Sequence, residues 1–428
     1  MDLTFSNRIR ELRELDRLKK RQGLVVIMGR RRVGKTRLLK EWIARSGGCY
    51  SQAIEAQTAV QISQIHEDIK SALNLPGEPR SWEELFDRID LSRKKFILCL
   101  DEFPYLAVSD PSLPSRLQKW LDHSKKKGKL IVVSGSSTSL MYRDVLSARA
   151  PLYGRAVKIL LIQPMKYLDF VKCLKLDPSA VDSFLLFSIV GGFPKYWELI
   201  DAAKTVIENA EELYFDPSSY FEGEPSRLLS DEKANSLYPL SVLEAIGRGA
   251  EKPSEIAGRL EIPQTTLSKT FEQLIHASIL KRDTPFGSSV RSPKKVLYRL
   301  GDPTLRFWFR VCSPHRSRWF SYPEEQKMEL IRWHASSVFE DYWRESHSGG
   351  QRFWEKGAEF DLVYRLDGKG KKIGVAEVKF QSLNEKERAK LLDDLKSRWE
   401  KSSISRKFSA GEFSILDWNA FVKHASSR

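Results

Sequence analysis

The sequence predicts an α/β protein in which a parallel sheet is followed by helical and mixed α/β modules. Short apolar runs at residues 24–28, 96–100 and 130–133 are typical of strands buried on both faces of a parallel sheet. A glycine-rich loop follows the first run, and residues 37–44 then show helical spacing. The chain has 428 residues, which is enough for several cores, so we expect two to four domains.

The composition favours a cytoplasmic protein that contacts a polyanion. No stretch approaches the roughly 18 uninterrupted apolar residues of a membrane span. The four cysteines lie far apart, which argues against a disulfide framework or a zinc site. A formal net charge of +15 would attract nucleic acid, so DNA is the expected partner. A solvated Lys-rich surface explains the same charge, and charge alone does not separate the two.

The glycine-rich loop carries the complete pattern G-x-x-x-x-G-K-T, which indicates a P-loop NTPase core. In such a loop the backbone N–H groups and the following helix N-terminus surround phosphates. Lys35 would reach the β- and γ-phosphate oxygens, and the Thr36 hydroxyl would ligate Mg²⁺. We therefore predict ATP and Mg²⁺ as cofactors, with nucleotide contacts from Gly29, Arg30, Arg31, Arg32, Val33, Gly34, Lys35, Thr36 and Arg37.

Two acids end the second apolar run. Asp101 is the predicted magnesium residue, and Glu102 is the predicted general base that polarises the attacking water. An apolar strand that ends in two acids is common on its own, and surface solvation then explains it. The upstream phosphate loop favours the catalytic interpretation.

Hydroxyls and one arginine follow the third run. Ser136 or Ser137 would sense the γ-phosphate or position water, although a serine-rich turn is an equally good explanation. Arg155 is a candidate for stabilising phosphate charge, within its own subunit or across a subunit boundary. An oligomer is therefore possible.

Beyond the sheet the chain divides into further modules. Apolar spacing becomes helical over 183–189 and 196–212, which predicts a helical lid. A polar interval with two prolines, 216–233, marks a boundary, and another falls near Ser313. The predicted domains are the P-loop core at 1–163, the lid at 164–230, a middle module at 231–312 and a final module at 313–428.

The middle module has the spacing of a winged helix. Helical patterns over 237–246, 253–257 and 263–277 precede two candidate strands at 279–281 and 294–300. Such a module binds DNA, or it serves protein docking or nucleotide gating. For DNA, the contacts would come from the third helix and a basic loop: Gln264, Thr265, Thr266, Ser268, Lys269, Arg291, Lys294 and Lys295.

The final module places acids on a predicted helix and a β-hairpin. Glu340 lies on a helix at 329–343, Asp361 on a strand at 360–366, and Glu377 with Lys379 on a strand at 373–380. Period-two alternation puts Glu377 and Lys379 on one face. The three carboxylates would hold Mg²⁺, and Lys379 would activate water for phosphodiester attack. A solvent-facing hairpin with charged cross-strand pairs is the structural alternative.

These motifs resemble the prokaryotic family of archaeal ATPases, a branch of the AAA-like and STAND NTPases. The resemblance covers most of the chain and includes Phe5-x-x-Arg8-x-x-Glu11-Leu12, Asp101-Glu102-Phe103, Gly135-Ser136-Ser137, Leu152-Tyr153-Gly154-Arg155 and Gly191-Gly192-Phe193-Pro194-x-Tyr196. It implies that Gly192 to Pro194 pack near the adenine, and that the helices after them form the lid that reports nucleotide state.

The final module is similar to the PD-(D/E)XK nuclease superfamily, although Phe360-Asp361 stands where that motif has Pro-Asp. The combined interpretation is an ATP-hydrolysing switch that couples nucleotide state to a DNA-binding winged helix and a nuclease-like module. The alternative is a non-catalytic regulator that holds nucleotide and binds DNA or protein without cleavage.

Overall fold

A five-stranded parallel sheet forms the N-terminal part of the molecule in a computed structural model, which describes residues 5, 7–75, 77–91, 96–124, 128–232, 238–288, 295–367 and 371–426. The strand order is β2-β3-β4-β1-β5, so β1 is paired with β4 and β5. The three predicted strands are confirmed. The five strands are β1 (Gly23–Met28), β2 (Cys49–Gln52), β3 (Phe96–Asp101), β4 (Lys129–Gly135) and β5 (Ala156–Leu161).

Helices cover both faces of this sheet because its central strands are apolar on both sides. On β1, Val25 and Ile27 face α1 (Ile9–Leu18) and α2 (Lys35–Ser46), whereas Leu24 and Val26 face the opposite core. The opposite core contains α3 (Thr58–Leu73), α4 (Trp82–Leu91), α5 (Phe103–Ser109) and α6 (Leu113–Ser124). Short helical turns, α7 (Thr138–Met141) and η1 (Tyr142–Leu146), follow β4.

A helical segment follows the sheet, but the predicted helical run at 196–212 is broken. The helix that contains Tyr196 ends at Trp197, and the next begins at Val206. Thr205 accepts a hydrogen bond from the Glu208 N–H (3.2 Å), and Glu208 accepts one from the Thr205 N–H (2.7 Å). This capping box starts a new helix. The elements are α8 (Tyr167–Leu174), α9 (Val181–Val190), α10 (Pro194–Trp197), α11 (Val206–Ala210), η2 (Glu211–Phe215) and α12 (Glu224–Asp231).

The middle module contains the predicted helices and hairpin around a core of its own. Its third helix lies against the N-terminal part, where the His276 ring packs on Tyr142 at 4.7 Å between centroids. Arg291 and Lys294 of the predicted basic loop lie outside the described residues, and Lys295 is exposed. The elements are α13 (Pro239–Gly247), α14 (Pro253–Arg259), η3 (Gln264–Leu267), α15 (Ser268–His276) and the antiparallel pair β6 (Leu280–Asp283) and β7 (Leu297–Leu300).

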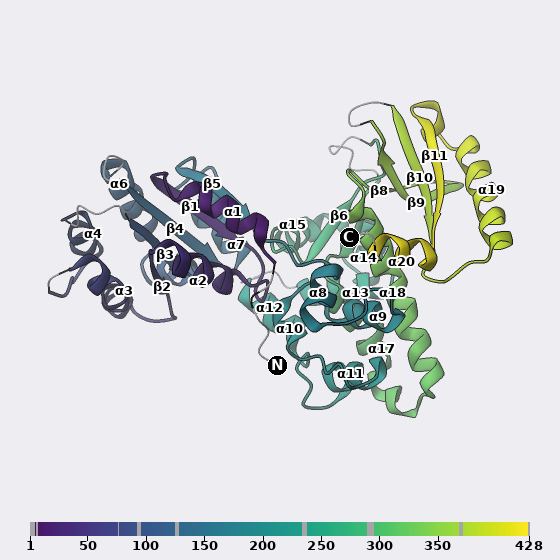
Figure 1. Ribbon diagram of the computed structural model, residues 1–428, viewed down its shortest axis with the longest axis horizontal. Coiled ribbons are helices and arrows are strands. Elements are labelled where there is room, and N and C mark those ends of the chain that lie inside the picture. Colours follow the sequence, from purple (N-terminus) through teal and green to yellow (C-terminus); the bar gives the residue numbers. More distant parts are fainter. Residues whose placement is uncertain are drawn as a thin grey trace.

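A second sheet forms the C-terminal part, at the other end of the molecule from the first (Figure 1). Its order is β11-β10-β9-β8, with β10 antiparallel to β9 and parallel to β11. The predicted long helix and hairpin are confirmed as α18, β9 and β10. The elements are α18 (Glu324–Ser346), β8 (Gln351–Glu355), β9 (Ala358–Arg365), β10 (Lys372–Val378), α19 (Glu385–Lys401), η6 (Ile404–Arg406), β11 (Ser409–Leu416) and α20 (Trp418–Ser426).

The helical segment shares one core with the C-terminal part. Phe184 of α9 packs against Phe339 of α18 and Phe421 of α20. His334 of α18 lies 2.8 Å from the Ser188 carbonyl through its Nε2. The hydrophobic core therefore continues across the predicted boundary at 313, which falls among α16 (Pro303–Phe307), η4 (Trp308–Cys312), α17 (Ser313–His315) and η5 (Arg316–Ser321). Within the described residues, no helix combines the length and apolar character that crossing a bilayer requires.

Candidate functional site

The phosphate loop lies between β1 and α2, where its glycines are required by geometry. A Cβ on Gly29 would lie 2.6 Å from the Ile162 carbonyl oxygen, and Gly34 has φ +94° at the start of α2. Lys35 is 4% exposed, and its Nζ donates to the carbonyl oxygens of Gly29 (2.7 Å) and Arg30 (3.1 Å). The ammonium is thus held inside the loop, where phosphate oxygens are expected to bind.

The environment of Lys35 weakens its hold on a proton. Burial lowers the pKa of its ammonium to about 8, and the negative charges of Glu102, Asp101 and Glu232 oppose that effect. Glu232 comes from the end of the helical segment, far from the loop in sequence. The nearby acids already offset the charge of the Lys35 ammonium. An anionic ligand therefore fits this environment best when a cation binds with it.

Thr36 and Asp101 meet at the end of the sheet, as predicted. The Thr36 hydroxyl donates to Asp101 Oδ2 at 2.7 Å, and the Tyr50 hydroxyl donates to the same oxygen at 2.8 Å. The other oxygen, Oδ1, accepts from the Ser134 hydroxyl and from the Glu102 N–H (3.0 Å). Asp101 is fully buried, yet all its partners are neutral donors.

A magnesium ion fits the Thr36–Asp101 pair. Protein sites hold Mg²⁺ through one or two hard oxygen ligands, and substrate phosphates and water supply the others. A hydroxyl and a carboxylate 2.7 Å apart, next to a phosphate loop, provide such ligands. Sequence reasoning found this pair but missed Tyr50 and Ser134, which orient the carboxylate.

Glu102 faces the end of the neighbouring strand. Its backbone adopts the left-handed conformation (φ 54°), which non-glycine residues rarely adopt. Its carboxylate accepts from the Ser136 hydroxyl and from the Ser136 N–H at 3.2 Å. The predicted base and the predicted sensor are therefore in contact. They line a cleft of about 290 Å³ together with Arg31, Ser137 and Ser230.

Arg155 lies at the opposite end of the sheet. It precedes β5, whose first residue pairs with Leu24 at the start of β1, whereas the phosphate loop follows Met28 at the end of β1. Leu24 and Met28 are four residues apart on this strand, which corresponds to roughly 13 Å. Arg155 instead pairs with Asp122 at 3.0 Å. The predicted action on phosphates within its own subunit does not agree with this position, and action across a subunit boundary stays a prediction.

The variable residues of the phosphate loop contact helices that lie far along the chain. Arg30 pairs with Asp302 at 2.9 Å, and both side chains are buried. Arg32 forms an ion pair with Glu224 and donates to the Tyr196 hydroxyl at 2.9 Å. These acids escaped sequence analysis because nothing local distinguishes them from surface carboxylates.

The remaining predicted nucleotide contacts lie around the same loop. Pro194 starts α10 beside the loop, 4.0 Å from the position of a Cβ on Gly34. The guanidinium of Arg30 lies 4.7 Å from the centre of the Phe193 ring. Val33 is buried, and Arg37 is exposed on α2. The segment around Pro194 therefore lies near the phosphate loop, and its contact with the adenine stays a prediction.

The predicted C-terminal acids also come together. The β9–β10 ladder ends at the Leu362–Ala376 pair, and beyond it the Asp361 carboxylate accepts the Val378 N–H at 2.9 Å. Burial and then the negative charges of Glu340 and Glu377 raise the pKa of Asp361 to about 7. Asp361 therefore shares one electrostatic neighbourhood with both other acids.

Cations occupy the outer sides of these acids. Glu377 accepts from Lys379 at 2.7 Å and from Arg398 at 2.9 Å, and Glu340 accepts from Arg344 at 3.2 Å. Across the residues that the structure describes, His, Cys, Asp and Glu side chains nowhere gather in a group of three or more that could hold a metal ion. The predicted three-carboxylate metal site is thus not assembled in this arrangement, because ion pairs turn Glu340 and Glu377 toward cations.

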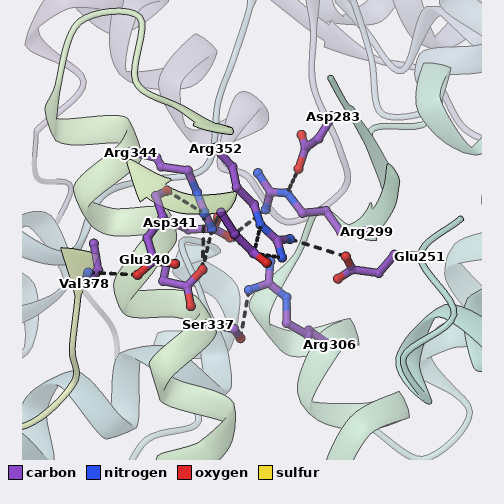
Figure 2. Close-up of polar contacts among 12 residues, drawn as sticks. Glu251, Asp283, Arg299, Arg306, Ser337, Glu340, Asp341, Arg344, Arg352 and Val378 are labelled. Atoms are coloured by element: carbon purple, nitrogen blue, oxygen red, sulfur yellow. Dashed lines mark hydrogen bonds and ion pairs between the residues drawn. The ribbon is translucent and has the colours of Figure 1, made fainter. Parts of the chain in front are cut away.

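An ionic cluster lies next to this site and joins three elements (Figure 2). Asp341 accepts from Arg299 of β7 (2.8 Å), Arg306 of α16 (2.7 Å) and Arg344 of α18 (3.0 Å). Burial would raise the pKa of Asp341, but the three arginines outweigh burial and hold it well below its ordinary range. Because Asp302 caps α16 and Arg306 lies on it, one short helix connects this cluster to Arg30 of the phosphate loop.

Comparisons with known proteins agree with the N-terminal site. Residues 5–200 match the model of an ATPase domain found predominantly in Archaea. An uncharacterized protein of Methanocaldococcus jannaschii is 29% identical over 391 residues, which cover 87% of this chain and 86% of the relative. The likeness to that relative extends well beyond the matched domain.

One solved structure supports the fold. The Walker-type ATPase of Pyrococcus abyssi superposes with a TM-score of 0.52 at 18% identity, covering 72% of this chain and 96% of that one. The Aeropyrum pernix ORC1 protein in complex with DNA is similar at a TM-score of 0.36 and 15% identity, over 74% of this chain and 94% of that one. The second likeness is too remote to bear on function.

Proposed function

We propose that this chain, whose residues 5–200 match the model of an ATPase domain found predominantly in Archaea, binds and hydrolyses ATP with Mg²⁺. The observation that carries the proposal is that Thr36, at the start of α2, meets Asp101, while Glu102 meets Ser136, at the ends of the adjacent strands β3 and β4. A metal-binding pair and an oriented carboxylate lie beside a glycine loop that contains a buried ammonium.

Each side chain has a distinct role in this proposal. The loop N–H groups and Lys35 bind the phosphates, and Thr36 with Asp101 would hold Mg²⁺. Magnesium neutralises phosphate charge and fixes the geometry of the transferred group. Ser136 orients Glu102, which accepts a proton from water in line with the γ-phosphate. Arg31 lines the same cleft and supplies positive charge.

Replacing Lys35 tests this assignment. We expect Lys35→Ala to lose at least about a hundredfold in Mg·ATP affinity or turnover, because a charge-assisted contact to phosphate is removed from a buried site. Isothermal titration with Mg·ATP and a phosphate-release assay measure the two quantities. Arg45→Gln, which removes an exposed cation from the last turn of the same helix, is the control. Unchanged affinity and turnover in Lys35→Ala would refute the phosphate-loop assignment.

The ATPase would act as a switch on the modules that follow it. Arg30 and Arg32 of the loop pair with Asp302 and Glu224, so a change in loop conformation alters contacts with α16 and α12. A ligand shifts such an equilibrium only through different affinities for the two states. Hydrogen exchange of β9 with and without nucleotide, in native protein and Asp302→Asn, tests the link. An identical nucleotide response in both proteins would count against α16 as the connection.

The middle module would act as a winged helix on DNA. The first turns of its third helix are open to solvent, and these residues offer side chains that bind bases or phosphates: Gln264, Thr265, Thr266, Ser268 and Lys269. Substituting Thr266 and Lys269 by alanine should weaken DNA binding, which fluorescence anisotropy measures. Unaltered binding would favour protein docking or nucleotide gating for this module.

The C-terminal acids support a nuclease-like module. Asp361, with its raised pKa, lies between Glu340 and Glu377, and Lys379 is held at Glu377. An active nuclease would cleave plasmid DNA with Mg²⁺ or Mn²⁺ in the native protein and lose that cleavage in Asp361→Ala and Lys379→Ala. Equal nicking by all three proteins would indicate a contaminant.

A non-catalytic regulator is the second candidate function, and the ion pairs favour it at the C-terminal site. Lys379 and Arg398 occupy the two oxygens of Glu377, which makes that carboxylate a poorer metal ligand. In that case the native protein holds nucleotide and binds DNA or protein, without cleavage and without Mg²⁺-dependent turnover. Turnover and cleavage measured together on one preparation separate the two candidates.

A further inference from the structure

A row of exposed basic residues runs along α1, on the ATPase domain rather than on the middle or C-terminal module. Steps of three and four residues place its members on one face of the helix and of the turn that follows it. The first 50 residues hold 14 Lys and Arg against five Asp and Glu, so this region carries much of the net charge. The row, called the α1 stripe, consists of Arg10, Arg13, Arg17, Lys20 and Arg21, all exposed.

Apart from the contact of Glu14 with Arg17, the acids of α1 pair with cations outside the stripe. Among the described residues, Arg10, Arg13, Lys20 and Arg21 form no ion pair, and the side chain of Arg17 is 77% exposed at 3.4 Å from Glu14. The stripe therefore presents uncompensated positive charge to solvent. The acids pair as Glu11 with Arg8 (2.9 Å), Glu14 with Lys158 (2.6 Å) and Asp16 with Lys19 (2.8 Å).

The shape of the stripe favours a linear polyanion. A helix that lies on a membrane inserts an apolar face, but the apolar face of α1, with Leu12, Leu15 and Leu18, is buried in the core of the domain. Arginine predominates, and its forked guanidinium suits phosphate oxygens. From Arg10 to Lys20 the chain advances roughly 15 Å, over which one strand of DNA carries about four phosphates.

We propose that the α1 stripe binds the phosphate backbone of double-stranded DNA. This site deepens the DNA binding proposed above but does not depend on the third helix of the middle module. The helix that carries the stripe also contacts the phosphate loop. Arg8, where α1 begins, donates from Nη2 to the Val33 carbonyl of the phosphate loop at 2.7 Å. DNA on the stripe therefore contacts the helix that supports the loop.

A salt titration of DNA binding tests the proposal. The variant Arg10→Gln, Arg13→Gln, Arg17→Gln and Lys20→Gln keeps residues with good helix propensity and removes four charges. The matched control removes four exposed charges from α19: Lys386→Gln, Lys390→Gln, Lys396→Gln and Lys401→Gln. Fluorescence anisotropy with one DNA duplex, between about 50 and 200 mM salt, gives the slope of log affinity against log salt.

In the stripe variant the magnitude of that slope should fall by about 3 to 4, at about 0.9 per lost phosphate contact. The α19 control should keep a slope near the native value. A native slope in the stripe variant, an equal loss in both variants, or tighter native binding to duplex RNA of the same length would overturn the proposal. If native protein binds no DNA, the DNA function proposed above fails as well. Should the fourfold variant not fold, Arg13→Gln with Arg17→Gln should still lower the slope by about 2.

Discussion

The acids of the nucleotide site and those of the C-terminal sheet have different neighbours. Asp101 and Glu102 are oriented by neutral donors, namely the hydroxyls of Thr36, Ser134 and Ser136 with that of Tyr50. Glu377 and Glu340 instead face the cations Lys379, Arg398 and Arg344. Asp101 and Glu377 each lie near the end of a strand, whereas Glu340 lies on α18, and the two groups differ in the charge of the residues that donate to them.

The donors around the acids determine how strongly each site would attract a metal ion. Hydroxyl donors fix a carboxylate without cancelling its charge, so the nucleotide site keeps its attraction for Mg²⁺. Cationic donors fix a carboxylate and offset only part of its charge. Burial, and then the remaining negative charge of Glu340 and Glu377, raises the pKa of the third acid, Asp361, to about 7. At the nucleotide site the cation Lys35 donates to loop carbonyls, which leaves the carboxylates open to Mg²⁺, whereas at the C-terminal site Lys379 and Arg398 donate to Glu377 itself.

Removing the charge of Glu102 should have the largest effect. Glu102→Gln keeps the size of the side chain but loses the base, so we expect ATP turnover to fall by about 10²- to 10⁴-fold with nucleotide affinity nearly unchanged. Multiple-turnover phosphate release and nucleotide titration measure both quantities. Glu55→Gln removes another acid that lines the same cleft and should leave turnover near native. Full activity in Glu102→Gln would mean that another group activates the water.

Removing the charge of Asp361 should stabilise the protein. The pKa of Asp361 in the folded protein is about 7, above its ordinary value of 3.8. Above pH 7 the charged carboxylate therefore destabilises the folded state, and this destabilisation decreases as the pH falls. Asp361→Asn should have a larger free energy of unfolding than native at pH 8. The difference between the two proteins should be smaller by roughly 2 kcal/mol at pH 5. Denaturant unfolding at the two pH values measures it.

An exposed acid on α19 supplies the control for that measurement. Asp393→Asn removes one charge outside the acid cluster and should show the same difference from native at both pH values. If the stability difference between Asp361→Asn and native does not change with pH, or if native is the more stable at pH 8, then burial and the charges of Glu340 and Glu377 do not raise the pKa of Asp361.

The sequence predicted the parts of the molecule that follow from local pattern. Unbroken apolar runs identified β1, β3 and β4, and the chemistry of a phosphate loop led from Thr36 to Asp101, because parallel strands present their carboxyl ends at one edge. Period-two alternation placed Glu377 and Lys379 on one face, and they contact each other at 2.7 Å. Local spacing was sufficient for these features.

Long-range contacts were not predicted, since no local signal encodes them. Asp302 and Glu224 become partners of the phosphate loop only after the helices pack. The position of Arg155 was misjudged because residues 156–161 were not recognised as a strand. Once β5 is known to run parallel to β1, a residue that precedes it must lie at the edge opposite the phosphate loop.

The smallest expected effect concerns the cation at the C-terminal acids. Arg398 donates from Nη2 to Glu377 at 2.9 Å, so Arg398→Gln removes positive charge beside three acids and should free that carboxylate for a metal. We expect Mn²⁺ affinity, measured by isothermal titration without nucleotide, to rise about tenfold, which equals about 1.4 kcal/mol.

Another arginine on α19 provides a matched control for this change. Arg388 pairs with Asp417 at 2.7 Å rather than with the three acids, so Arg388→Gln should leave Mn²⁺ affinity near native. A gain in both variants would reflect net charge alone. A loss in Arg398→Gln would mean that the guanidinium holds Glu377 in a geometry that the metal requires, and the contrast between the two acid sites would then be one of orientation rather than of charge.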